Sequence, residues 1–318
     1  MIPTVIHVNS EIRGRFAPSP SGRLHLGNIC SSLLAWLDAR HLGGEMIFRL
    51  EDLDPERSYM DYAQLMADDL RWLGLDWDAG WPEDEGFAQG ERTALYEEAF
   101  ETLRTRGLLY RCWCSRAERL AARAPHPGEE QPGSCACRNL TGEALEARLH
   151  GKRPSAWKVI VPDRDITIID AHLGEYTRNP ARSGGDFIVR RSDGVFAYQL
   201  AVSVDDMLMG VTRVVRAEDL LSSSPGQHWL IETLGGTPPV YAHAPLLTAP
   251  DGRKLSKRDG DLNMAELRER YTPEELTGRL AYLCGLIDRI EPVQPRELIF
   301  DFDWSKVKRG EIDLSGVF

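Results

Sequence analysis

Apolar residues recur at helical spacing in the first third of the chain. The clearest stretch, residues 58–73, has its apolar positions three or four residues apart: Tyr62, Leu65, Met66, Leu70 and Leu73. Residues 25–42 and 91–106 are also predicted as helices. A glycine follows each of the three stretches, and glycine is a common residue just after a helix.

Short apolar runs of strand type alternate with these helices. Residues 11–17 precede the first predicted helix, and residues 45–50 precede the second. Strands that alternate with helices indicate an α/β fold, in which helices cover a parallel sheet. Ligands on such sheets bind at the carboxyl ends of the strands, where residues 15–25 and 51–54 fall.

The middle of the chain departs from this alternation. Residues 108–150 contain four cysteines and a segment rich in Pro, Gly and Glu, so we expect an insertion there. Strand-like runs follow at residues 156–161 and 166–169. Residues 186–191 and 195–204 are predicted as a strand pair joined by a Ser-Asp-Gly turn.

Two more helices are predicted towards the end. Residues 226–234 form the first. The second begins after Thr272, a hydroxyl cap followed by Pro273 and by Glu275, which can bond back to the cap. The acidic and aromatic residues 300–304 are expected to pack back on the body of the protein.

Composition and charge restrict the functional classes. The chain has 318 residues, 42% of them hydrophobic and 27% charged, as in ordinary soluble proteins. No apolar stretch reaches membrane-spanning length and no secretory signal is present, so we expect a cytoplasmic protein with no membrane partner. A net charge of −11 does not indicate a nucleic-acid partner, because proteins that bind nucleic acids are typically basic. Cationic residues do gather at 104–123 and 138–158, where they form either a local RNA footprint or solvated helix faces.

Residues 14–28 are the first candidate for chemistry. They run from a strand through a Pro/Ser/Gly turn to His25-Leu-Gly-Asn28 at a helix start. A helix N-terminus binds anions, His25 can donate to a phosphate oxygen, and Gly27 lets a nucleotide approach the backbone. Taken alone, this tetrapeptide is better explained as an ordinary helix start.

The second candidate is Lys254-Leu-Ser-Lys-Arg258. It follows the turn-forming residues 250–253, so Lys254 and Lys257 are expected on an exposed loop. Lysines on such a loop could close over a triphosphate.

Four of the six cysteines occur as two Cys-x-Cys pairs separated by twenty residues: Cys112, Cys114, Cys135 and Cys137. Four thiolates fit one tetrahedral structural Zn²⁺, which would hold together an insertion without its own core. Free thiols and disulfides are the alternatives. Cys30 and Cys284 lie in apolar helical surroundings.

Together, these motifs resemble the two signatures of class I aminoacyl-tRNA synthetases. The runs 15–22, 49–54, 196–206 and 211–219 resemble the glutamate-activating branch, and the resemblance covers roughly residues 11–285. It implies a Rossmann-like catalytic domain with a parallel sheet, a zinc-bearing insertion and a short helical C-terminal part. The implied parts are residues 1–107 and 186–260 for the two catalytic halves, 108–185 for the insertion or acceptor-like subdomain and 261–318 for the C-terminal part.

The resemblance implies activation of glutamate by ATP, with Mg²⁺ accompanying the ATP. His25 and Lys257 would stabilise the phosphates with help from Lys254, and the ATP-binding residues would be His25, Gly27, Asn28 and Lys257. The implied glutamate pocket consists of Arg15, Phe16, Ala17, Pro18, Ser19, Glu51, Tyr198 and Arg216. Arg216 and Tyr198 could instead merely satisfy neighbouring groups. Relatives often follow Cys-x-Cys with a Tyr and a single later Cys, which leaves open whether Cys135, Cys137 or both bind zinc.

Glutamyl-tRNA synthetases continue with a helical anticodon-binding domain, whereas only residues 288–318 follow the last helix predicted here. This combination resembles the glutamyl-queuosine tRNA(Asp) synthetases. It implies tRNA-independent activation of glutamate, its transfer to queuosine in the anticodon of tRNA(Asp), no anticodon-binding domain and a monomer. The alternatives are a truncated glutamyl-tRNA synthetase that charges tRNA(Glu), and a non-catalytic paralogue that binds RNA or ATP.

Overall fold

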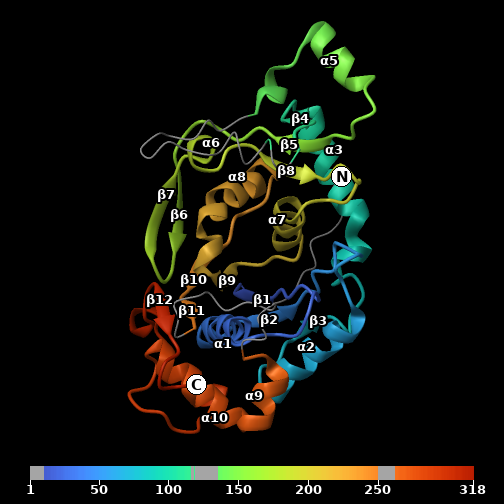
Figure 1. Ribbon diagram of the computed structural model, residues 1–318. Coiled ribbons are helices and arrows are strands. Elements are labelled where there is room, and N and C mark those ends of the chain that lie inside the picture. The colour runs from blue at the N-terminus through green and yellow to red at the C-terminus, as the bar shows by residue number, and fades with distance from the viewer. Residues whose placement is uncertain (1–10, 116–117, 119–134, 250–261) are drawn as a thin grey trace.

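Strands from the first eighty residues form a three-stranded parallel sheet. The computed structural model describes residues 11–115, 118, 135–249 and 262–318 (Figure 1). Strand β1 (Arg13–Phe16) pairs with β2 (Glu45–Phe48), which pairs with β3 (Ala79–Gly80). Helix α1 (Leu26–His41) connects β1 to β2, as the predicted alternation requires.

A second sheet has four strands, which come from residues 166–244. Its strands run in the order β7 (Gly174–Arg178), β6 (Ile166–Asp170), β10 (Val240–Ala244) and β9 (Arg213–Ala217). β6, β10 and β9 are parallel, and β7 is antiparallel. The two sheets meet where the Thr212 N–H, just before β9, donates to the Arg13 carbonyl of β1 at 3.0 Å. β1 and β9 therefore lie side by side although about two hundred residues separate them, and their carboxyl ends face the same region.

The described residues between 109 and 159, which belong to the predicted insertion, lie at the end of the molecule opposite the C-terminal elements (Figure 1). Its antiparallel sheet has the order β4 (Leu109–Cys112), β5 (Ala156–Val159) and β8 (Phe187–Arg190). The 3₁₀ turn η2 (Ala136–Asn139) and α5 (Gly142–Leu149) also belong to this region. β6 and β7 fall within residues 108–185, yet β6 pairs with β10 and β7 with β6, so this range also contributes two strands to the second sheet. The domain division given above stays a prediction.

The C-terminal residues fold back against α1. Trp304 donates its indole N–H to Asp38 Oδ1 at 2.7 Å, and Phe302 is buried beside it. This packing confirms the expectation for residues 300–304, except that Phe300 is 88% exposed. β12 (Glu311–Asp313) returns to pair with β11 (Leu246–Thr248).

The helix predicted after Thr272 is confirmed as α10 (Pro273–Cys284). The Thr272 side chain accepts from the Glu275 N–H, and the Glu275 carboxylate accepts from the Thr272 N–H. Gly285 ends the helix with a φ of 85°, a conformation that favours glycine. Apart from α7, which is described below, the other helices and 3₁₀ turns of the described residues are α2 (Met60–Trp72), α3 (Thr93–Thr105), α6 (Pro180–Ser183), α8 (Ser224–Leu234), α9 (Met264–Arg270), η1 (Gln89–Arg92), η3 (Glu218–Ser223), η4 (Pro295–Leu298) and η5 (Trp304–Lys306).

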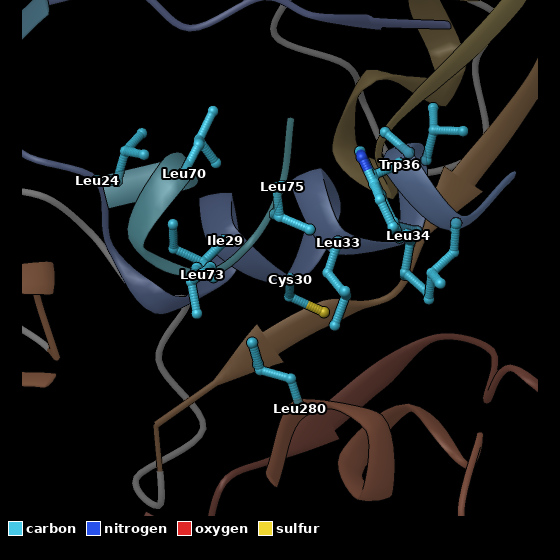
Figure 2. Packing of buried hydrophobic residues seen from close by; sticks show 14 of the residues in the cluster. Leu24, Ile29, Cys30, Leu33, Leu34, Trp36, Leu70, Leu73, Leu75 and Leu280 are labelled. Atoms are coloured by element: carbon cyan, nitrogen blue, oxygen red, sulfur yellow. The ribbon is translucent and has the colours of Figure 1, made fainter. Parts of the chain in front are cut away.

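Helix α1 is at the centre of the main hydrophobic core (Figure 2). Its Ile29 and Leu33 pack with Leu70 from α2 and Leu280 from α10. The helix can approach β1 closely because residue 14 is glycine. A Cβ there would lie 2.7 Å from Met46 Sδ and 3.0 Å from Ala39 Cβ. Tight packing of α1 fixes the position of its N-terminus, which forms part of the site described below.

The strand predicted at residues 195–204 is wrong beyond its first residues. Arg190 and Phe196 form an antiparallel bridge, as the predicted turn requires, but the chain then forms helix α7 (Tyr198–Leu208). Residues 200–206 of this helix are all buried, so its sequence shows no polar face with helical spacing. A helix buried on all sides cannot be told from a buried strand by periodicity.

Candidate active site

A cavity of about 330 Å³ opens at the carboxyl ends of β1 and β9 and at the start of α1. The loops that follow β2 and β10 complete its wall. Most of the residues predicted for the glutamate and ATP sites line this one cavity. They are Arg15, Phe16, Ala17, Pro18, His25, Gly27, Asn28, Glu51, Tyr198 and Arg216.

The remaining predicted site residues are Ser19, Lys254 and Lys257. Ser19 lines a neighbouring cavity of about 410 Å³, which shares Glu51 and Tyr198 with the first. Lys254 and Lys257 lie outside the described residues. The described residues on either side of that segment are close to the site. Leu247 lines the cavity, and the Leu262 carbonyl accepts from the Leu26 N–H at 3.1 Å.

His25 is the N-cap of α1, and this role fixes which ring nitrogen can donate. Its Nδ1 accepts from the Gly27 N–H at 3.1 Å, while Asn28 Oδ1 accepts from the His25 N–H at 3.2 Å. A nitrogen that accepts carries no proton, so in the neutral ring Nε2 is the donor. A Cβ at position 27 would lie 3.1 Å from His25 Cε1, so Gly27 leaves room for this ring.

Arg15 brings a buried positive charge to the cavity. Its Nη1 donates to the Val215 carbonyl at 2.8 Å, and its Nε lies 3.5 Å from Asp206 Oδ1. Burial lowers the pKa of Arg15, and the nearby Arg49 and Arg216 lower it further, against the opposing effect of Asp206. A guanidinium that is destabilised in this way is a favourable partner for an incoming carboxylate.

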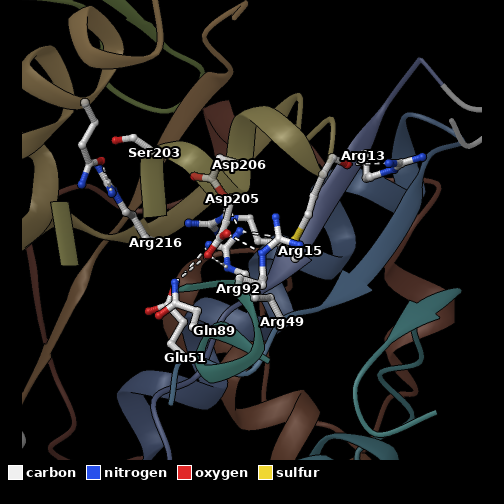
Figure 3. A network of polar contacts seen from close by, with 12 residues as sticks. Arg13, Arg15, Arg49, Glu51, Gln89, Arg92, Ser203, Asp205, Asp206 and Arg216 are labelled. Carbon is white, nitrogen blue, oxygen red and sulfur yellow. Dashed lines mark hydrogen bonds and ion pairs between the residues drawn. The ribbon is translucent and has the colours of Figure 1, made fainter. Parts of the chain in front are cut away.

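Arg49 organises the acidic side chains beneath the cavity (Figure 3). It is fully buried and donates to Asp206 Oδ1 at 2.7 Å and to Glu51 Oε1 at 3.1 Å. The neighbouring Asp205 accepts from groups on η1 and α3: Gln89 Nε2, Arg92 Nε and Tyr96 Oη. This network holds Glu51 in the cavity wall.

Glu51 is the acidic group of this network that lines the cavity. Burial raises the pKa of Glu51 above its ordinary value, although Arg49 and Arg15 act in the opposite direction. In its ionised form, this carboxylate can accept hydrogen bonds from a substrate ammonium.

Arg216 provides a second cation, and neutral groups hold all three of its nitrogens. Nη1 donates to Gln227 Oε1 and Nη2 to Ser224 Oγ, both at 2.7 Å, and Nε donates to His243 Nε2 at 3.2 Å. No carboxylate lies within ion-pair distance of Arg216 in the part of the chain that the structure describes. Its charge is therefore available to an anionic ligand.

Sequence reasoning missed several residues of this site. Arg49 and Asp206 lie within the runs 49–54 and 196–206, but the sequence predicted no function for either residue. They contact each other across 157 positions of the chain, which no local pattern reveals. A charged residue inside an apolar strand run was the available signal for Arg49, since such a residue needs a buried partner. Nothing in the local pattern signalled Ser31 and Ser32, which line the cavity from α1.

The four paired cysteines come together as a possible metal site. Their sulfur atoms all lie within 4.8 Å of one another, with Cys112 and Cys135 at 3.5 Å and Cys114 and Cys137 at 3.6 Å. Four thiolates at about 2.3 Å from a tetrahedral zinc would be about 3.8 Å apart. The cluster therefore fits a metal ion of this kind, and both Cys135 and Cys137 belong to it.

Comparisons with known proteins agree with this geometry. The family model for the catalytic domain of class I tRNA synthetases (E and Q) matches residues 11–308. A glutamyl-Q tRNA(Asp) synthetase from Symbiobacterium thermophilum is 50% identical over 307 residues, 93% of this chain and 94% of that protein. One from Nitratidesulfovibrio vulgaris is 46% identical over 298 residues, 91% of each chain.

A solved structure has the same fold. The glutamate tRNA ligase of Elizabethkingia meningosepticum, in complex with its amino acid, aligns with a TM-score of 0.78 at 28% identity. The alignment covers 96% of this chain and 67% of that one. The predicted Rossmann-like catalytic fold with a parallel sheet is thus confirmed. The chain belongs to the class I tRNA synthetases of the glutamate and glutamine branch and, within them, to the glutamyl-Q tRNA(Asp) synthetases.

Proposed function

We propose that the protein activates L-glutamate with ATP, without tRNA, and transfers the glutamyl group to queuosine in the anticodon of tRNA(Asp). The observation that carries the proposal is the charge pattern of one cavity. Two buried arginines, Arg15 and Arg216, and one buried carboxylate, Glu51, line it. Glutamate has two carboxylates and one ammonium, so each of its charges finds an opposite partner.

The ATP site is proposed at the start of α1. The N-terminus of α1 and the His25 Nε2–H group are both suited to bind anionic groups such as phosphates. Gly27 and Asn28 line the same cavity. ATP would enter as its Mg²⁺ complex, and the glutamate α-carboxylate would attack the α-phosphate in line. Such a reaction needs positioning and charge stabilisation rather than a covalent enzyme intermediate. Lys254 and Lys257 are proposed to approach the phosphates from the segment between Leu247 and Leu262.

The names of the relatives at 50% and 46% identity favour queuosine as the acceptor over the 3′ end of tRNA(Glu). A hydroxyl of its cyclopentene ring would attack the adenylate. Exposed loop bases are also the part of RNA that proteins bind most readily. No helix in the described part of the chain is long and apolar enough to cross a membrane. A cytoplasmic location and a monomeric state stay predictions.

Glutamate-dependent exchange of pyrophosphate into ATP, measured without tRNA, tests the activation step. Glutamine is the matched control because it has the same length but lacks the second carboxylate. We expect exchange with glutamate and little with glutamine. No exchange with glutamate, or equal exchange with both amino acids, would contradict the proposed use of the two arginines.

Glu51 should impose an acid limit on glutamate activation. Its carboxylate must be ionised to accept from the substrate ammonium, and its raised pKa means that it gains a proton before an exposed glutamate does as the pH falls. kcat/KM for glutamate should therefore fall at a pH above the ordinary carboxyl value of about 4.3. Glu51→Gln should lower kcat/KM at neutral pH and flatten this limb. An identical acid limb in both proteins would remove Glu51 from this role.

One structural zinc ion is proposed at Cys112, Cys114, Cys135 and Cys137. It would tie the end of β4 to η2, which lie on either side of residues 119–134. Metal analysis of the purified protein should find close to one zinc per chain. Cys112→Ser and Cys137→Ser should each abolish most of this zinc content, because a closed tetrahedral site needs all four ligands. A fully folded protein without zinc would end the metal interpretation.

A further inference from the structure

A chain of buried polar groups runs behind Arg216, away from the cavity. Asp170, at the end of β6, contacts His243 on β10, and His243 contacts Arg216 on β9. The exposed fractions of the three residues are 2%, 0% and 6%. Asp170 Oδ2 lies 2.5 Å from His243 Nδ1, and His243 Nε2 lies 3.2 Å from Arg216 Nε. His243 and Arg216 are also paired residues of adjacent parallel strands, so the sheet itself holds them opposite each other.

The Arg216 and Asp170 contacts of His243 together select one arrangement of protons. Ser224 Oγ also lies 3.2 Å from His243 Nε2 and, as a hydroxyl, can donate to this nitrogen or accept from it. An arginine Nε–H can only donate, so His243 Nε2 must accept and carries no proton. His243 Nδ1 must then carry the proton of the neutral ring, and it donates this proton to Asp170. Burial lowers the pKa of His243, and Arg216 lowers it further against the effect of Asp170, which agrees with a neutral ring. The Asp170 carboxylate thus fixes the tautomer that Arg216 requires.

We propose that Asp170 and His243 are positioning residues for glutamate recognition, because they fix the guanidinium plane of Arg216 through a neutral imidazole. The inference rests on the proposed function, in which Arg216 binds a substrate carboxylate. A neutral acceptor at Nε orients the guanidinium without cancelling its charge, which a carboxylate in the same place would do. The guanidinium of Arg216 therefore has a fixed orientation and keeps its positive charge when the substrate binds.

Asp170→Asn is the most informative substitution because it is nearly isosteric. The asparagine oxygen can still accept from the His172 and Leu173 N–H groups, which Asp170 Oδ1 binds at 3.0 Å and 2.8 Å. Its amide nitrogen would then donate to His243 Nδ1 and drive the proton to Nε2, where it would oppose the Arg216 Nε–H. We expect the KM for glutamate to rise about tenfold while the KM for ATP stays unchanged. An unchanged KM for glutamate, or a parallel rise for ATP, would overturn the proposal.

A pair of substitutions at His243 provides the matched control if Asp170→Asn does not fold. The amide oxygen of His243→Gln can accept from Arg216 Nε, whereas His243→Leu cannot. We expect glutamine to keep the KM for glutamate closer to the wild-type value than leucine does. In an Arg216→Ala background, His243→Leu should cause no further rise. Equal effects of glutamine and leucine, or a full additional effect without Arg216, would show a merely structural role.

Nitrogen-15 spectra of histidine-labelled wild-type protein test the tautomer without relying on activity. The His243 signal, assigned by its loss in His243→Gln, should show a protonated Nδ1 and a bare Nε2 at neutral pH. A protonated Nε2 would contradict the positioning role. If the wild-type protein shows no glutamate-dependent exchange, the proposed function fails, whereas the spectrum still decides the state of His243.

Discussion

Arg216→Ala is expected to raise the KM for glutamate about a hundredfold while the KM for ATP changes little. The guanidinium is buried and has only neutral partners among the described residues, so its loss leaves a substrate carboxylate without its counter-charge. The measurement is the initial rate of pyrophosphate exchange over a range of glutamate concentrations at saturating ATP.

Arg216→Lys is the matched control for this result. Lysine keeps the positive charge but lacks the planar fork that Gln227, Ser224 and His243 hold in place. Its KM for glutamate should therefore lie between those of the wild-type and alanine proteins. If alanine leaves the KM for glutamate unchanged, Arg216 does not belong to the pocket.

His25→Asn is expected to slow adenylate formation by about 10²–10³-fold, the usual cost of losing one donor to developing negative charge. Asparagine can still cap α1, because its side-chain oxygen can accept from a backbone N–H of the first turn. It cannot place a donor where His25 Nε2–H lies. Single-turnover formation of glutamyl-adenylate measures the step directly.

His25→Ala separates the two roles of this residue. Alanine removes both the cap and the donor, so it should slow adenylate formation as much as asparagine does. It should also lower the free energy of unfolding by about 1 kcal/mol, whereas asparagine should leave it nearly unchanged. A His25→Asn protein that forms adenylate at the wild-type rate would exclude His25 from phosphate stabilisation.

The parts of the fold that are determined by residues close together in the sequence could be predicted from it. α1 and α10 have local start and stop signals, such as the Thr272 and Glu275 capping box and the glycine after each helix. α7 could not be predicted in the same way, because neighbours on all sides bury it and remove the polar face that marks a helix.

The residues of the site also fall into two groups, those that the sequence indicated and those that it did not. His25 stands out because it begins a helix directly after a short segment of turn residues. Arg15 was implied by the resemblance to the family. The resemblance to the family pointed to Glu51, Tyr198 and Arg216, and the structure brings all of these residues to one cavity. The groups that hold the site residues in place come from distant segments, so composition and spacing carry no signal for them. His243 is one example, since it contacts Arg216 and Asp170 from a separate strand.

Transfer of labelled glutamate in the presence of ATP tests the central claim most directly. Three acceptors should be compared: tRNA(Asp) that contains queuosine, tRNA(Asp) that lacks it, and tRNA(Glu). Our account predicts that label appears only on the queuosine-containing tRNA(Asp). Label on tRNA(Glu) would instead indicate a conventional synthetase, and label on none of the three would contradict the account.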